Sequence, residues 1–321
     1  MYYTRRDIAK IALAALPASR LLAKLDSKFG GVQIGINAPY SFHGMPGDAD
    51  SVLKDLTELG LSVVELRSQP VEAFFGAPVS TQLGRPRGSR RPTTPEEKEQ
   101  QRAKQRATAD ALEKWRLSAP TDRFKEFRKK YEDAGVAIQI VKFDGVDKMK
   151  DEVVDYAFGL AKALGARAIS CEIPVSRTKW LGEFATKHKM MVGYHGHAKV
   201  NDPEAFAAPA SWEKAMSYSK YNGINLDIGH FIAGNNTSPI PFMKKYADRI
   251  THVHLKDRKL NNGPNVPWGQ GDTPIKEVLQ LMKKEKYPFQ GTIEFEYPVP
   301  AGSTEMQEIA KCVQFCKDCL A

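Results

Sequence analysis

Short apolar segments rich in β-branched residues recur along the chain, and each is followed by a stretch with apolar residues at helical spacing. Three of these helical stretches end in Gly60, Gly135 and Gly165, one or two residues before the next apolar segment. Glycine is a common helix stop, because it adopts the left-handed conformation without steric cost. The pattern predicts eight strands: Val32–Ile36, Ser62–Leu66, Ala137–Phe143, Ala166–Ile173, Met190–His195, Gly223–Ile228, Ile250–Leu255 and Gly291–Tyr297.

Strands and helices that alternate over residues 30–321 predict a (β/α)8 TIM barrel, a fold of the α/β class. The alternative is a doubly wound open sheet, which needs a glycine-rich phosphate loop after its first strand. Residues 37–43, which follow the first strand, hold no such loop, so the barrel is favoured.

Residues 76–118 interrupt the alternation. Gly76–Pro95 is rich in Pro, Gly, Ser and Arg and is predicted to be a loop. Glu96–Trp115 is rich in helix-forming polar residues and is predicted to be an exposed helix. Because this basic insertion follows the second strand, we expect it beside the active site, as a lid, a partner surface or a solvated decoration.

Ionisable residues stand at the ends of four consecutive predicted strands. In a barrel these ends surround one pocket, and barrel enzymes take their catalytic groups from them. Buried carboxylates and imidazoles together are costly unless they pair or hold a cation. Two imidazoles and two carboxylates suit a divalent ion such as manganese, cobalt, zinc or iron. The predicted ligands are His195, Asp227, His254 and Glu294. His252 shares a strand face with His254, but His254 lies nearer the mouth.

Charge and composition narrow the classes of function. The net charge is +9, but residues 1–24 hold five basic and one acidic residue, and residues 76–118 hold ten and five. These segments account for +4 and +5, so the rest of the chain is neutral and no nucleic-acid partner is expected. No apolar run approaches the ~18 residues that cross a bilayer, so no membrane insertion is expected. Cys312, Cys316 and Cys319 share one helical stripe and are predicted to be buried small residues, not a metal knuckle.

Residues 1–24 have the features of a targeting segment. Arg5 and Arg6 precede the short apolar stretch Ile11–Leu16, and small residues follow. This order resembles a twin-arginine export signal. We therefore expect export to the periplasm by that route. The alternative is an ordinary amphipathic helix of a cytoplasmic protein.

Four motifs, taken together and in order, resemble the xylose isomerase-like TIM barrel family, which includes sugar phosphate isomerases and epimerases. The motifs are Leu226-Asp-Ile-Gly-His230, His252-Val-His-Leu-Lys-Asp257, Trp268-Gly-Gln-Gly-Asp272 and Thr292-Ile-Glu-Phe-Glu296. The resemblance covers about residues 30–321. The superfamily also includes inosose dehydratases, dehydroshikimate dehydratases and endonuclease IV, a member of AP endonuclease family 2.

The resemblance assigns the same four metal ligands, with one departure. In the epimerases, Glu, Asp, His and Glu of four successive strands hold the metal. His195 stands where those enzymes have the first Glu, which is also one of their two acid/base groups. The His-x-His of this strand is more similar to the dehydratase and lyase branches, in which the second His, here His197, is a candidate base. Glu172, from the neighbouring strand, is a reserve ligand.

The resemblance implies a metal-dependent sugar isomerase or epimerase. Such an enzyme abstracts a proton next to a carbonyl or hydroxyl that the ion polarises. Mn²⁺ is the expected ion, with Co, Zn, Mg and Fe as alternatives. We expect His197 or Glu294 to be the base, because imidazole and carboxylate groups serve as general bases. The predicted substrate contacts are His43, Glu65, Lys142, His230, Lys256 and Trp268.

Other functions stay open at this point. The first alternative is a dehydratase or lyase that acts on a keto-sugar or keto-glycoside. The others are an endonuclease IV-like phosphodiesterase and a non-catalytic sugar-binding protein. The expected partner is a small carbohydrate, and a homo-oligomer is left open.

Overall fold

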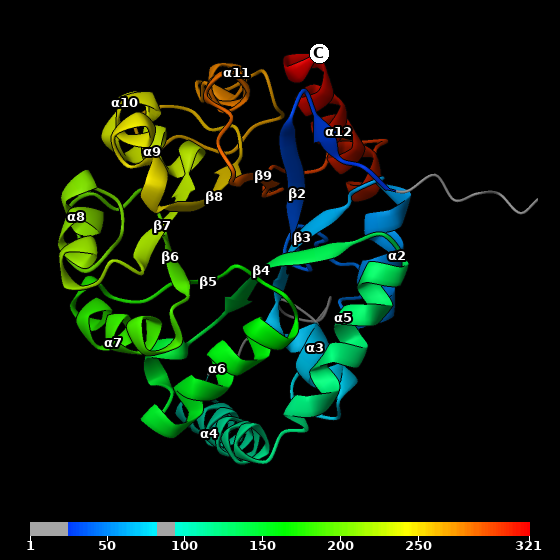
Figure 1. The fold of residues 1–321 in the computed structure, drawn as a ribbon, viewed down its shortest axis with the longest axis vertical. Helices are drawn as coiled ribbons and strands as arrows, with labels where there is room; N and C mark the ends of the chain where they lie inside the picture. The colour runs from blue at the N-terminus through cyan, green and yellow to red at the C-terminus, as the bar shows by residue number, and fades with distance from the viewer. Residues whose placement is uncertain (1–24, 82–93) are drawn as a thin grey trace, which may run out of the picture.

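The computed structural model describes residues 25–81 and 94–321. Within them, parallel strands β2 to β9 close into a barrel, because β2 pairs with both β3 and β9. Figure 1 shows these strands at the centre and the helices around them, which confirms the predicted (β/α)8 barrel. A short strand, β1 (Lys28–Phe29), pairs antiparallel with β2. The barrel strands are β2 Val32–Ala38, β3 Val63–Arg67, β4 Ala137–Phe143, β5 Ala168–Cys171, β6 Met191–His195, β7 Asn222–Asp227, β8 Ile250–Leu255 and β9 Gln290–Ile293.

The helices follow the strands in alternation and cover the barrel with their apolar faces. Gly60, Gly135 and Gly165, predicted to end helices, have φ of 71°, 84° and 78°, the left-handed region that favours glycine. The described helices are α2 Ala49–Glu58, α3 Ser68–Phe74, α4 Pro95–Leu117, α5 Phe124–Asp133, α6 Asp151–Ala163, α7 Thr178–His188, α8 Pro209–Tyr218, α9 Ile228–Asn235, α10 Ile240–Lys245, α11 Ile275–Glu285 and α12 Glu305–Leu320.

The predicted strands differ most from the structure at the last one. Gly291–Tyr297 was expected, but β9 ends at Ile293. The Glu294 amide still donates to the Leu255 oxygen of β8 at 3.0 Å, but the Phe295 amide donates to Ser41 Oγ at 3.1 Å, so the chain leaves the sheet at this point. Glu294 therefore lies on the segment that leaves the strand, at the mouth of the barrel.

The insertion contains the predicted exposed helix, α4, none of whose residues is buried. It begins with a capping box, in which Thr94 and Glu97 exchange side chain to backbone hydrogen bonds. Near its end, Arg116 Nε donates to Glu72 Oε1 at 2.7 Å, so the helix is attached at its C-terminal end. Residues 82–93 and the predicted export segment, residues 1–24, lie outside the described residues.

The structure also bears on the C-terminal cysteines and on membrane insertion. Cys312, Cys316 and Cys319 are free thiols buried on α12, as predicted. Among residues 25–81 and 94–321, no helix combines the length and the apolar character that a membrane crossing requires.

Candidate metal centre

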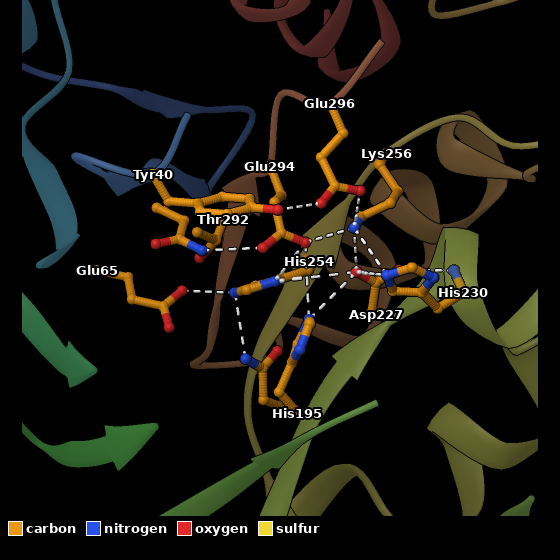
Figure 2. A network of polar contacts seen from close by, with 12 residues as sticks. Tyr40, Glu65, His195, Asp227, His230, His254, Lys256, Thr292, Glu294 and Glu296 are labelled. Atoms are coloured by element: carbon orange, nitrogen blue, oxygen red, sulfur yellow. Dashed lines mark hydrogen bonds and ion pairs between the residues drawn. The ribbon is translucent and has the colours of Figure 1, made fainter. Parts of the chain in front are cut away.

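Four side chains from consecutive strands meet at the carboxyl end of the barrel. Each offers one ligand atom, and these atoms all lie within 4.8 Å of one another. His195 Nε2 is 3.3 Å from Asp227 Oδ2, and His254 Nδ1 is 3.1 Å from Glu294 Oε2. All four residues are buried, and Figure 2 shows their side chains pointing toward one another. The fold thus brings together the four residues predicted as ligands.

Each carboxylate of this cluster has one oxygen fixed by the chain. Asp227 is the N-cap of α9, and its Oδ1 accepts from the His230 amide at 2.7 Å. Glu294 Oε1 accepts from Asn37 Nδ2 at 2.9 Å. The second oxygens, Oδ2 and Oε2, therefore face the two imidazoles. Asn37 was not among the predicted site residues.

Glu65 fixes the orientation of His254. Its Oε2 lies 2.5 Å from His254 Nε2 and 3.1 Å from His252 Nε2, and all three side chains have 0% exposure. Burial raises the pKa of Glu65, but the two imidazoles outweigh it and hold that pKa well below its usual range. A carboxylate behind a ligating His holds the N–H on that side and directs the other nitrogen to the metal. Glu65 was predicted to touch substrate; the structure places it behind His254 instead, out of reach of solvent.

The cluster fits a divalent cation. His254 Nδ1 is buried, has no hydrogen-bond partner among the described residues and faces Glu294 Oε2 at 3.1 Å. Two acceptors facing each other are costly unless a proton or a cation lies between them. Burial lowers the pKa of His254, but Glu294 and Glu65 more than offset this and raise that pKa above its usual value. Two imidazoles and two carboxylates suit a borderline divalent ion and do not select one metal.

Lys256 supplies a positive charge beside the cluster. Its Nζ lies 3.0 Å from Asp227 Oδ2, 2.6 Å from Glu294 Oε2 and 2.6 Å from Glu296 Oε2. Burial lowers the pKa of Lys256, but these three carboxylates raise it well above its usual value. Lys256 was predicted to touch substrate; the structure instead pairs its ammonium with carboxylates of the chain itself.

Glu296 and Tyr40 belong to the same network and were not predicted as site residues. Tyr40 donates its hydroxyl to Glu296 Oε1 at 2.6 Å, and Figure 2 shows the pair next to Lys256. Alternation along the last predicted strand puts Glu294 and Glu296 on one side, so a sequence signal for Glu296 existed. Tyr40 lies in the loop after β2, where no periodic pattern identifies it.

A second imidazole–carboxylate pair lies at the rim of the cluster. Glu172 Oε2 is 3.1 Å from His197 Nε2, and the two side chains are 42% and 41% exposed. Glu172 Oε1 lies 2.5 Å from Lys142 Nζ and 3.4 Å from His195 Nδ1. Burial raises the pKa of Glu172, but His195, His197 and Lys142 together hold it below its usual range. The structure therefore places the predicted reserve ligand behind His195 and next to the predicted base.

Of the predicted substrate contacts His230, His43 and Trp268, only His230 is seen to adjoin the cluster in the part of the chain that the structure describes. His230 Nε2 lies 3.1 Å from Lys256 Nζ at the edge of the cluster, and burial, together with Lys256, lowers its pKa well below the usual value. His43 Nε2 lies 2.9 Å from the backbone oxygen of Phe295 and is half-buried. Trp268 packs edge-on against an aromatic ring of α12, and no contact between it and the cluster is seen among the described residues.

The third motif holds the loop after β8 in place. Asp257 Oδ2 accepts from the amides of Gly269 and Gly271, both at 2.8 Å, and its Oδ1 accepts from the Thr273 amide at 3.2 Å. A Cβ at Gly271 would lie 1.9 Å from Asp257 Oδ1, so only glycine permits this approach. The motif is therefore explained by backbone geometry, whereas Trp268 was predicted from it as a substrate contact.

Comparison with known proteins identifies the family. The profile of the xylose isomerase-like TIM barrel family matches residues 109–319, more than half of the chain. The chain belongs to this family. The chain is also similar to the inosose dehydratase of Clostridium beijerinckii (strain ATCC 51743 / NCIMB 8052), with 32% identity over 136 residues. This alignment covers 41% of the chain but only 38% of the relative's length.

Solved structures of the same fold cover nearly the whole chain. The probable 3-DHS dehydratase AsbF from Bacillus anthracis has a TM-score of 0.58 at 12% identity and covers 88% of this chain and 97% of its own. The 3-keto-D-glucoside 4-epimerase YcjR from E. coli has a TM-score of 0.59 at 9% identity and covers 90% of this chain and 100% of its own. At such identities, the similarity shows the fold alone.

Proposed function

We propose that this chain is a metal-dependent enzyme that removes a proton beside the carbonyl of a keto-sugar, with loss of water as the outcome. One observation carries the proposal: the buried cluster of two imidazoles and two carboxylates adjoins the half-exposed pair of His197 and Glu172. Membership of the family and the similarity to an inosose dehydratase support it. We therefore favour a dehydratase over an isomerase or epimerase.

The buried cluster would hold the ion. The ligand atoms would be His195 Nε2, Asp227 Oδ2, His254 Nδ1 and Glu294 Oε2. A divalent ion bound there acts as a Lewis acid toward a substrate oxygen and acidifies the neighbouring C–H. Mn²⁺ is the ion we expect, with Co, Zn, Mg and Fe as alternatives that the same donors accept.

His197 would be the base. If its Nε2–H donates to Glu172 Oε2, its Nδ1 keeps a lone pair that can take a proton. Lys142 holds the other oxygen of Glu172 and so fixes the direction of this pair. The exposed fraction of the His197 side chain, 41%, leaves it accessible to a ligand at the barrel mouth.

Elimination of water needs only one acid/base group, because the same imidazole can take up the proton and then release it. His197 takes the hydrogen next to the carbonyl, and the C–H electrons form the new double bond as the hydroxyl on the next carbon leaves. The proton on the imidazole then passes to that hydroxyl, which departs as water. The base is thereby restored, and the products are an unsaturated ketone and one molecule of water.

Epimerisation or isomerisation is the second candidate. Glu294 Oε2, which lies 2.6 Å from Lys256 Nζ, would then have to carry a proton on another side of the substrate. Against it, His195 stands where a symmetric reaction needs a second carboxylate, and Glu172 already serves His195, His197 and Lys142.

The experiment that tests the proposal is product analysis with candidate ketones. An inosose and a 3-keto-D-glucoside are incubated with Mn²⁺-loaded protein, and the reaction is followed by NMR and by ultraviolet absorbance. We expect an unsaturated ketone to appear and the metal-free protein to be inactive. An isomer with no loss of water supports the second candidate. Cleavage of a phosphodiester with no reaction of any ketone contradicts both.

A further inference from the structure

Arg67 is a buried cation at the barrel mouth that the proposed reaction does not use. It is the last residue of β3, next in register to Lys142 of β4, and 9% of its side chain is exposed. Its guanidinium lies 4.8 Å from the centre of the Tyr40 ring. Through Tyr40, Glu296 and Lys256, Arg67 is connected to the metal cluster by successive contacts.

Donors of Arg67 remain unused. Its Nη1 pairs with Asp144, whose side chain is 38% exposed, but its Nε is buried and has no partner among the described residues. A buried guanidinium donor without an acceptor is costly, and a ligand that supplies oxygen atoms would satisfy it. Lys142 adds to the positive potential, because its Nζ has a single contact, with Glu172, among the described residues.

From this geometry we infer that Arg67 recognises a carboxylate of the substrate, so that the keto-sugar on which the enzyme acts is an acidic one. This inference rests on the proposed function for the identity of the substrate as a keto-sugar. A planar guanidinium that is stacked on a ring presents parallel N–H groups, and these match the two oxygens of a carboxylate. The Tyr40 ring lies 4.8 Å from the guanidinium carbon and Asp144 contacts Nη1, so Nε is the donor that a ligand would satisfy.

The position of Arg67 fits a ligand that spans the mouth. Burial and the charge of Arg67 lower the pKa of Lys142, while Glu172, Glu65 and Glu294 raise it and prevail. Lys142 is the register neighbour of Arg67, and its Nζ contacts Glu172, whose Oε1 lies 3.4 Å from His195 Nδ1, so Lys142 connects Arg67 to the metal cluster. A sugar whose carbonyl meets the cluster would carry its acidic group toward Arg67.

The test is a binding measurement with sugars that differ only in the acidic group. Calorimetric titration of Mn²⁺-loaded protein compares 2-keto-D-gluconate with D-fructose, and D-glucuronate with D-glucose. We expect the wild type to prefer the acid in at least one pair. Arg67→Gln should weaken the binding of that acid about 10- to 100-fold and leave its neutral counterpart unchanged. Arg123→Gln, which removes an exposed arginine paired with Glu126, is the matched control.

Asp144→Asn separates recognition from a structural role. It frees the guanidinium from a competing carboxylate, so binding of the acid should tighten a few-fold. If Arg67 is only structural, both variants will weaken acid and neutral sugar alike, and the inference is overturned. Tighter binding of D-glucose 6-phosphate than of D-glucuronate would also overturn it. If Arg67→Gln does not fold, Asp144→Asn alone tests the inference: tighter binding of the acid supports it, and unchanged or weaker binding overturns it.

The outcomes separate this inference from the proposed function. Binding of an acidic sugar that depends on Arg67, with no reaction of any ketone, supports the inference and contradicts the proposed function. Turnover of a neutral keto-sugar, with no preference for the acid in either pair, supports the proposed function and contradicts the inference.

Discussion

Two imidazole–carboxylate pairs flank the same cluster, and they differ in their exposure to solvent. His254 and Glu65 are both at 0% exposure, and His252 shares the same carboxylate oxygen. His197 and Glu172 are 41% and 42% exposed and lie at the rim. The chemical groups are the same, so the environment must distinguish their roles.

From this difference we propose that the buried pair positions a metal ligand and that the exposed pair takes part in the chemistry. A buried carboxylate that is surrounded by imidazoles holds them in place and is closed to a ligand. The exposed pair leaves one nitrogen of His197 able to meet a substrate. The two pairs should therefore respond differently when either member is removed.

The largest effect is expected from removing a ligand at the centre of the cluster. Asp227→Ala deletes a carboxylate that contacts His195 and Lys256, so both the metal and activity should fall to background. Metal content is measured by elemental analysis after gel filtration. Asp318→Ala, an exposed aspartate on α12, is the control. Stoichiometric metal bound by Asp227→Ala with wild-type affinity would rule out the ligand assignment.

Removing the exposed imidazole should affect the rate and not the metal. His197→Ala is expected to lower kcat by about 10²–10⁴-fold, which is typical of the loss of a general base. Metal content should remain at the wild-type level, because His195 stays in place. His188→Ala removes an imidazole from another His–carboxylate pair, with Asp155, and should keep full activity. Normal turnover of His197→Ala, with exchange abolished only in Glu294→Gln, would transfer the role of base to Glu294.

Changing the buried carboxylate should affect the metal and much less the rate. Glu65→Gln is expected to weaken metal binding by about 10- to 100-fold, as for other partners of ligating histidines. Saturating Mn²⁺ should restore most of kcat, a rescue that His197→Ala cannot show. Glu308→Gln removes a buried carboxylate that contacts Tyr297, outside the site, and serves as the control. A rate defect in Glu65→Gln that excess metal leaves unchanged would contradict a positioning role.

Substitutions in the N-terminal segment, residues 1–24, are expected to have the smallest effect on activity. We propose that residues 1–24 direct export, because Arg5 and Arg6 precede a short apolar stretch. Arg5→Lys/Arg6→Lys should retain the protein in the cytoplasm without altering the activity of purified protein. Cell fractionation measures this. If wild type and variant are both cytoplasmic, the segment is not an export signal.

The sequence pattern predicted the barrel, the order of its strands and the four residues of the cluster. The alternation of strands and helices predicts the cluster because the carboxyl ends of all the barrel strands surround one pocket. It did not predict that Glu65 reaches His254, which is 189 residues away, because such pairing depends on how the barrel closes. It also missed Arg67 and Tyr40, whose roles arise from packing at the mouth.

Hydrogen exchange at the carbon beside the substrate carbonyl tests directly whether His197 is the base and Glu65 a positioning residue. Wild type, His197→Ala and Glu65→Gln are compared in heavy water at saturating Mn²⁺, with an inosose or 3-keto-D-glucoside that the wild type converts. If His197 is the base and Glu65 only positions His254, that hydrogen should exchange in wild type and in Glu65→Gln, and almost not at all in His197→Ala. Equal exchange in all three proteins, or exchange lost in Glu65→Gln alone, would contradict these roles.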